Sequence, residues 1–229
     1  MNEIYSNSIG KIYNGEKAII SLTSWKARIN TVSKTLFSLL KQCPGFHIVL
    51  VLSEEEFPQK EAVLPENLML FVNSNLIELL WVYKNYKSFK KLLFTMKKYS
   101  DIPIISADDD CIYTCNYAEM LYQYYLRYNK NPIVYTKQRK TCWTQGISTI
   151  YPPIYYQKLI DEFNYKKWKN KGDDDYLGNF FNRHKIPILS LKKPKFPCFF
   201  HDEIKPLNGS NNCKNWIELQ DFKGIKNEI

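Results

Sequence analysis

The chain lacks an apolar run long enough to cross a bilayer, and it lacks a secretory pattern at its amino terminus. Its apolar runs, such as Ile48–Leu52, are far shorter than the roughly 20 residues of a membrane-spanning helix. Met1–Tyr5 places no basic region before an apolar one. The eight glycines follow no period, which excludes a collagen-like or Gly-rich linker protein. We therefore expect a soluble, cytoplasmic protein.

Paired cysteines are also lacking. The six cysteines include no Cys-x-x-Cys pair, and Cys111 and Cys115 lie beside a carboxylate cluster rather than near histidines. A structural zinc site would need closer and repeated ligand spacing. We expect free, reduced thiols, as in a reducing compartment.

The chain does contain enough apolar residues for a core. Its 229 residues are 45% hydrophobic and 15% aromatic, which excludes a disordered chain and suffices for one large domain or two small ones. The net charge of +9 favours anionic partners, which include phosphates, nucleic acid and an acidic membrane face. Abundant Lys, Asn, Tyr and Ile are also typical of an AT-rich genome, so the charge alone does not choose a partner.

Apolar runs alternate with helix-like stretches in the first half of the chain. Strands are predicted at residues 18–22, 47–52, 68–72, 79–83 and 102–105, and helices at 30–42, 88–99 and 116–127. Capping boxes are predicted at Ser53–Glu56 and Asn116–Glu119. This alternation indicates an α/β sheet with parallel strands.

The second half of the chain alternates less regularly. Extended segments are predicted at residues 132–136, 146–151 and 186–191, and helices at 153–163 and 174–183. We expect one α/β domain over residues 1–191. The tail, 192–229, reads as turns and short segments that either complete the site or are partly flexible.

The run Asp108-Asp109-Asp110 directly follows a predicted apolar strand. Ligands of open α/β sheets bind at the carboxyl ends of strands, where helix N-termini also point. Adjacent carboxylates repel each other there unless one is protonated or a cation neutralises them. We therefore predict that Asp108 and Asp110 hold a divalent ion, with positions left for a substrate diphosphate. The alternative is a solvated acidic turn.

Other charged residues are weaker candidates. Asp173-Asp174-Asp175 precedes a predicted helix, where acids are ordinary capping residues, but one of them could instead be a general base for an acceptor hydroxyl. The spacing does not decide between these roles. Lys90 and Lys91 are candidates for phosphate binding, and His201 in the tail is a candidate further metal ligand.

Several segments, in order, resemble a family of bacterial glycosyltransferases whose opening strand is typically written VSLTSYPARI. The matching segments are Ile19–Ile29, Leu52–Pro58, Lys87–Leu92, Ala107–Tyr113, Gly146–Pro153 and Gly172–Tyr176. Trp25-Lys26 replaces the usual Tyr-Pro, and Gln145–Ser148 lacks the usual double glycine. The exostosin-type transferases also place a triple Asp at a strand end.

The resemblance implies a GT-A fold, the Rossmann-like fold of nucleotide-diphospho-sugar transferases. In this fold helices flank a mixed sheet. The resemblance also implies a nucleotide-diphosphate-sugar donor and Mn²⁺ or Mg²⁺. The donor-binding residues that it implies are Thr23, Ser24, Arg28, Lys90, Lys91, Asp108 and Asp109. Asp108 and Asp110 become the metal pair, with His201 as the further candidate. Asp174 falls at the position of the catalytic carboxylate, and Asp173 is the second candidate.

We therefore expect a metal-dependent glycosyltransferase that builds a bacterial surface glycan such as capsule or lipooligosaccharide. Its acceptor would be a glycan or a lipid-linked molecule, and a peripheral contact with the cytoplasmic face of the inner membrane would follow from the basic charge. One alternative is a sugar-phosphate nucleotidyltransferase, which would release pyrophosphate. The other is a basic nucleic-acid-binding protein, but that function would not explain the triple Asp, and we expect no nucleic-acid partner.

Overall fold

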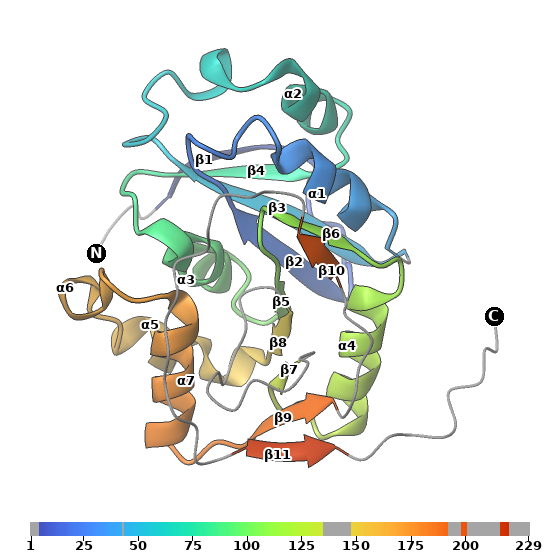
Figure 1. Ribbon diagram of the computed structural model, residues 1–229, viewed down its shortest axis with the longest axis vertical. Coiled ribbons are helices and arrows are strands. Elements are labelled where there is room, and N and C mark those ends of the chain that lie inside the picture. Colours follow the sequence, from blue (N-terminus) through green and yellow to red (C-terminus); the bar gives the residue numbers. More distant parts are fainter. Residues whose placement is uncertain (1–4, 43, 135–147, 192–197, 201–215, 220–229) are drawn as a thin grey trace.

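A computed structural model describes residues 5–42, 44–134, 148–191, 198–200 and 216–219. A mixed sheet with the strand order β1-β4-β3-β2-β5-β8-β7-β9-β11 runs through the centre of the molecule (Figure 1). Its strands are β1 (Tyr5–Gly10), β2 (Ala18–Thr23), β3 (Phe46–Ser53), β4 (Glu78–Val82), β5 (Ile104–Ser106), β7 (Ile133–Val134), β8 (Thr149–Tyr151), β9 (Ile188–Leu191) and β11 (Trp216–Leu219). A second, two-stranded sheet pairs β6 (Cys111–Tyr113) with β10 (Cys198–Phe200).

Helices cover both faces of the large sheet. They are α1 (Val32–Leu40), α2 (Glu66–Asn73), α3 (Lys90–Lys98), α4 (Tyr117–Arg127), α5 (Tyr156–Asp161), α6 (Tyr165–Trp168) and α7 (Asp173–Arg183), with 3₁₀ turns at η1 (Lys60–Val63), η2 (Lys87–Phe89) and η3 (Pro153–Tyr155). One apolar core contains buried residues of α1, α2 and α4, and the other contains those of α3, α5, α6 and α7. Figure 1 shows α1 and α4 on one side of the sheet and α3, α5 and α7 on the other.

The expected parallel arrangement is confirmed at the centre of the sheet. β2 pairs in parallel with both β3 and β5, and β3 pairs in parallel with β4. β1 and β8 run antiparallel to their neighbours, so the sheet is mixed. Strands that are buried on both faces have continuous apolar sequences, and this is why the sequence predicts β2, β3 and β4 as strands. The carboxyl ends of β2, β3 and β5 therefore lie along one edge of the sheet.

The prediction of a strand at residues 68–72 is wrong, because this segment belongs to α2. Leu68 and Val72, four residues apart, are buried, whereas Leu70 between them is 59% exposed. That spacing matches one helical turn and not the period of two residues that a strand would show. Short apolar runs do not distinguish the two elements by themselves.

Both predicted capping boxes are also wrong. Residues 54–56 form a turn, although the Ser53 hydroxyl does donate to Glu56 Oε2 at 3.1 Å. Helix α4 begins after Asn116 as expected, but the Asn116 side chain makes no capping hydrogen bond. Glu119 instead accepts hydrogen bonds from Lys17 and from Gln123. Glu119 thus contacts Lys17, 102 residues away, and Gln123, one turn further along α4, instead of capping the helix.

A buried charged cluster lies where β4 begins, at the edge of the sheet opposite the carboxyl ends of β2 and β3. Glu78 is buried and accepts hydrogen bonds from His47 Nε2 at 2.7 Å, Lys98 Nζ at 2.5 Å and the Tyr99 hydroxyl. Burial by itself would raise the pKa of Glu78, but the hydrogen bonds from His47, Lys98 and Tyr99 hold it below its ordinary value.

Replacing Glu78 with Gln should lower the free energy of unfolding by about 3 kcal/mol, because Lys98 and its neighbours lose a buried anion. The lowered pKa means that this contribution is present above the pKa of the unfolded chain and is lost as the pH falls through the folded-state value. Urea unfolding at neutral and acidic pH measures both effects. Glu66→Gln, on the exposed side of α2, is the matched control. Equal unfolding midpoints for the two variants would contradict the prediction.

Among the residues that the structure describes, none of the helices has the length and apolar character needed to span a bilayer.

Candidate functional site

The site lies where β2 and β5 end side by side. These strands pair in parallel, with Ser21 opposite Ser106. β2 ends at Thr23 and β5 at Ser106, so the loop after β2 meets the acidic run that begins at Asp108. The Thr23 hydroxyl donates to the backbone oxygen of Val51 at 2.6 Å and so joins β2 to β3.

Asp109 and Asp110 are buried against the loop after β2. The Ser24 hydroxyl donates to Asp109 Oδ2 at 2.6 Å, and Arg28 Nη1 lies 2.9 Å from Asp109 Oδ1 and 3.1 Å from Asp110 Oδ2. Burial raises the pKa of Asp109 more than Ser24 and Arg28 lower it. Burial and the charge of Asp108 raise the pKa of Asp110. Ser24 and Arg28, expected in the nucleotide pocket, thus hold the acidic run in place.

Lys91 joins this acidic run to the second one. Its Nζ donates to Asp108 Oδ1 at 2.6 Å and lies 3.1 Å from Asp173 Oδ2, while its side chain is only 3% exposed. Burial alone would lower the pKa of Lys91, but the charges of Asp108, Asp173 and Asp174 raise it well above its ordinary value. The structure therefore brings the start of α3, the end of β5 and the start of α7 to one place.

The three acids that open α7 have different surroundings. Asp175 accepts a hydrogen bond from the backbone N–H of Gly172 at 3.2 Å, which is a helix-capping contact. Asp173 is buried beside Lys91, and Asp174 is partly exposed. The capping interpretation thus holds for Asp175. Asp174 remains the most accessible acid of the three beside Lys91.

Lys90 has other direct partners than Lys91. Its side chain is 1% exposed, and its Nζ donates to Glu56 and, at 3.0 Å, to Asn85 Oδ1. Burial lowers the pKa of Lys90 more than the charge of Glu56 raises it. The ammonium of Lys90 thus ties the loop after β3 to the start of α3, and its expected contact with a diphosphate stays a prediction.

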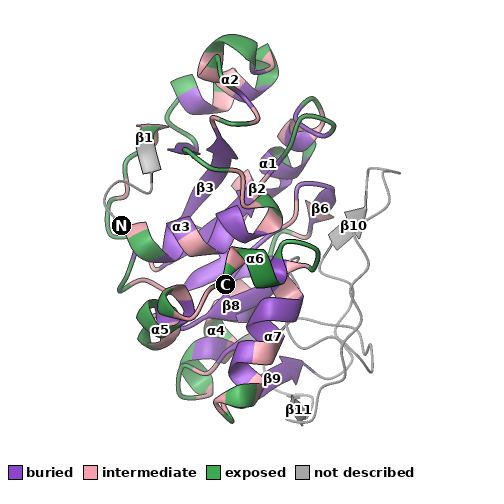
Figure 2. Cartoon of the chain, turned by 90° about the vertical axis from the view of Figure 1, so that its left-hand side faces the viewer, coloured by how far each residue is buried: buried purple, intermediate pink, exposed green. Residues whose placement is uncertain are grey.

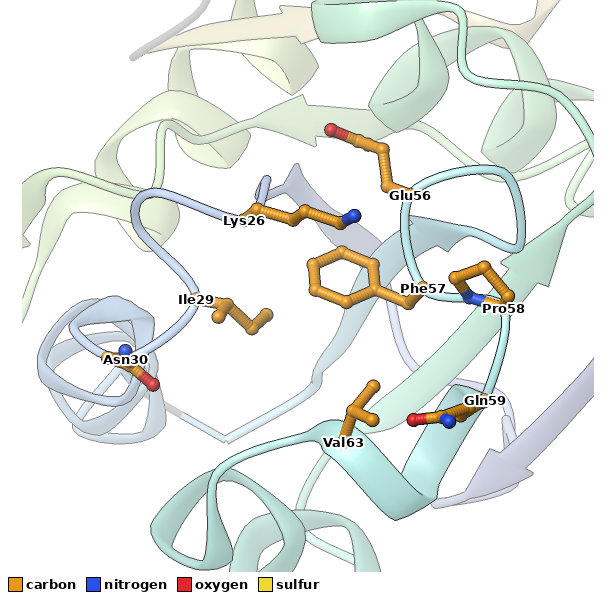
Figure 3. A pocket seen from close by; sticks show the side chains of 8 residues that line it. All are labelled: Lys26, Ile29, Asn30, Glu56, Phe57, Pro58, Gln59 and Val63. Atoms are coloured by element: carbon orange, nitrogen blue, oxygen red, sulfur yellow. The ribbon is translucent and has the colours of Figure 1, made fainter.

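An open hollow of about 340 Å³ lies between the loops that follow β2 and β3 (Figure 3). Lys26, Ile29 and Asn30 line it from one loop, and the other side is formed by Glu56, Phe57, Pro58, Gln59 and Val63. Because Arg28 belongs to the first of these loops and binds Asp109, the hollow is a neighbour of the acidic run.

Two carboxylates of the acidic run have the chemistry of divalent-cation ligands. Asp108 and Asp110 offer the hard oxygen ligands that Mg²⁺ and Mn²⁺ prefer, and the Asp108 side chain is 33% exposed. Five aspartates of the two runs gather around Arg28 and Lys91, so negative charge exceeds positive charge. Within the described residues, no group of three or more His, Cys, Asp or Glu side chains is placed to hold a metal ion.

The predicted ligand His201 lies outside the described residues. The backbone just before it is described, because β10 pairs antiparallel with β6 and sets Phe200 opposite Cys111. This part of the tail therefore runs beside the residue that follows Asp110.

Replacing Lys91 with Met should lower the free energy of unfolding by about 3 kcal/mol, because Asp108 and Asp173 lose the buried cation between them. Lys97→Met, at an exposed position on the same helix, is the matched control and should change stability by less than about 0.5 kcal/mol. Urea unfolding compares the two. If both variants unfold at the same urea concentration, Lys91 does not join the two runs as described.

Sequence reasoning missed the partners that fix the site. Glu56 and Asn85 hold Lys90, the Thr35 hydroxyl donates to the backbone oxygen of Asp109 at 2.9 Å, and the Tyr113 hydroxyl accepts from the backbone N–H of Asp108 at 2.8 Å. Glu56 and Tyr113 lie inside segments that resemble the transferase family, but no spacing pattern connects them to their partners.

Comparison with known proteins gives structural matches only. No protein-family model and no curated protein sequence matches the chain. TarS 1-349 from S. aureus aligns with a TM-score of 0.52 and 13% identity, over 70% of this chain and 53% of that one. The mannosyltransferase PcManGT from Pyrobaculum calidifontis, in complex with GDP-Man and Mn²⁺, aligns with a TM-score of 0.55 and 10% identity, over 86% of this chain and 60% of that one.

The chain thus spans little more than half the length of these two structures. At such low identity the likeness concerns the fold, which is of the GT-A type, as the resemblance of the sequence implied.

Proposed function

We propose that the chain is a glycosyltransferase that moves a sugar from a nucleotide-diphosphate donor to an acceptor hydroxyl with the help of a divalent cation. The observation that carries this proposal is the contact of Lys91 with both Asp108 and Asp173. It brings a carboxylate run at a strand end together with acids at a helix start, inside a fold of the GT-A type. One group of acids would hold the cation that binds the donor, and the other would supply a base for the acceptor hydroxyl.

The donor would lie along the edge formed by the carboxyl ends of β2, β3 and β5. The hollow between Lys26 and Phe57 suits the nucleoside part, because it opens beside the acidic run and is lined partly by apolar side chains. The diphosphate would then point toward Asp108 and Lys91. A bound Mn²⁺ at Asp108 and Asp110 would screen the diphosphate and stabilise the charge of the departing nucleotide.

The residues of the chain would supply positioning, charge and a base. Arg28 and Lys91 offset the charge of the buried carboxylates and so keep the acidic loop ordered for a ligand. Asp174, partly exposed at the first turn of α7, would accept the proton of the acceptor hydroxyl or orient that hydroxyl. A negatively charged side chain interacts favourably with a helix N-terminus.

The acceptor in this proposal is a bacterial surface glycan or a lipid-linked molecule, as in capsule or lipooligosaccharide synthesis. The support for it is the ordered set of sequence segments that resembles such transferases. A cytoplasmic location with peripheral membrane contact belongs to the same proposal.

Thermal unfolding with nucleotide sugars and nucleoside diphosphates, each with and without Mn²⁺, tests the proposal. A ligand that binds only the folded state stabilises it by about 2.7 kcal/mol at a hundredfold excess over Kd. We expect a rise in Tm with nucleotide and Mn²⁺ together, and a smaller one with either alone. If no nucleotide raises Tm in the presence of Mn²⁺, the proposal is wrong. Release of pyrophosphate from a sugar phosphate and a nucleoside triphosphate would instead identify a nucleotidyltransferase.

A further inference from the structure

Exposed lysines gather around α6, next to the start of α7. We call this group the α6 lysine cluster; it consists of Lys87, Lys166, Lys167, Lys169 and Lys171, all exposed. Lys87 Nζ donates to the backbone oxygen of Lys169 at 3.1 Å. Lys167 and Lys171 place their Nζ atoms 5.5 and 5.3 Å from the ring centre of Trp168. Figure 2 shows α6 as a largely exposed element beside α7.

The five lysines of the cluster concentrate positive charge at one surface. Within the described part of the chain, none of its five lysines forms an ion pair with a carboxylate. Glu55, across the neighbouring loop, accepts a hydrogen bond from the backbone N–H of Asn85. The acids at the start of α7 already surround Lys91. Such a surface attracts anions, and salt should weaken that attraction.

The cluster borders the site on the side of Asp174. Lys171 lies three residues before Asp174, so their Cα atoms are at most about 11 Å apart. Lys87 lies four residues before Lys91, whose Nζ contacts Asp173. The segment with Lys87 and the segment with Lys171 are therefore both followed, within four residues, by residues of the site.

We propose that the α6 lysine cluster binds phosphate groups of the acceptor, so that the acceptor is a chain of sugar or polyol units carrying phosphodiesters. This inference rests on the proposed function, because Asp174 marks the acceptor end of the site. The charges of the cluster match such a chain, and their place next to Asp174 would hold a hydroxyl of the chain at the carboxylate.

The surroundings of the cluster favour this partner over two other anionic ones. Trp168, the aromatic residue at its centre, is only 5% exposed, so its ring is not available to stack on nucleic-acid bases. In the described segments 84–89 and 163–171, which carry the cluster, no apolar side chain is exposed to anchor it in a lipid bilayer.

Binding of a fluorescently labelled glycerol phosphate oligomer to the full chain tests the inference. The variant is the triple substitution Lys167→Gln, Lys169→Gln and Lys171→Gln. The control removes the same charge elsewhere, by Lys34→Gln, Lys41→Gln and Lys97→Gln at exposed positions. We expect the first variant to bind the oligomer about tenfold more weakly or worse, and the control to stay within about twofold of wild type.

Three further measurements complete the test. An uncharged dextran oligomer should not bind measurably, and stabilisation by nucleotide and Mn²⁺ should be unchanged in both variants. Equal losses in the two variants, or no binding of the oligomer to wild type, would overturn the inference. So would binding of phosphatidylglycerol vesicles that depends on the cluster when the oligomer does not bind. Failure of the proposed function is separate, because it would abolish nucleotide stabilisation in wild type whatever the oligomer does.

Discussion

Replacing Asp108 with Asn is expected to abolish Mn²⁺-dependent donor binding and to slow sugar transfer by about 10²- to 10³-fold. Asp108 is the most exposed carboxylate of its run, and it contacts Lys91. The substitution keeps the shape of the side chain and removes its charge. Thermal shift with nucleotide and Mn²⁺, together with transfer assays, measures the effect. Asp101→Asn, at an exposed loop position, is the matched control and should behave like wild type.

Stability separates this expectation from simple damage to the fold. Burial and the charge of Asp108 raise the pKa of Asp110, as expected for neighbouring carboxylates that repel each other. Asp108→Asn removes this repulsion, although it also weakens the ion pair with Lys91. We therefore expect the variant to stay folded without metal, with an unfolding free energy within about 1 kcal/mol of wild type. Mn²⁺ stabilisation equal to that of wild type would show that Asp108 does not bind the ion.

Replacing Asp174 with Asn should lower the rate of transfer by about 10²- to 10⁴-fold and leave donor affinity nearly unchanged, as expected of a general base. Asp175→Asn is the contrasting variant, because Asp175 caps α7. It should cost about 1 kcal/mol of stability and leave the rate close to wild type. Single-turnover transfer, donor titration and urea unfolding of the two variants give the comparison. Equal rates in both variants would contradict a role for Asp174 in the reaction.

The configuration of the product tests the same role independently. Direct attack by a hydroxyl that Asp174 deprotonates should invert the anomeric centre, and NMR of the fresh product reports the configuration. If the configuration is retained, Asp174 does not act as the base of a direct displacement, and its effect on the rate is one of positioning.

Local patterns were sufficient to predict the central strands and the acidic run. Residues 18–22 and 47–52 are apolar without interruption because β2 and β3 are buried on both faces, and this property is visible in the sequence. The acidic run after β5 is equally visible in the sequence, because charged residues directly follow the apolar residues of the strand. The segment at 68–72 was too short for the pattern to separate a strand from a helix, and the tertiary packing of Leu68 and Val72 decided for the helix.

Only the tertiary structure determined which charged side chains contact each other. Lys91 and Asp173 are 82 positions apart, and Lys90 and Glu56 are 34 apart, so no spacing within one segment records either pair. Neighbouring lysines, identical in type, therefore enter different surroundings: Lys90 holds a loop and Lys91 joins two acidic runs. The physical reason is that a charged side chain contacts whatever the order of strands brings within reach. The sequence determined that acids and lysines stand at the ends of strands and helices, whereas the folded sheet determined how they pair.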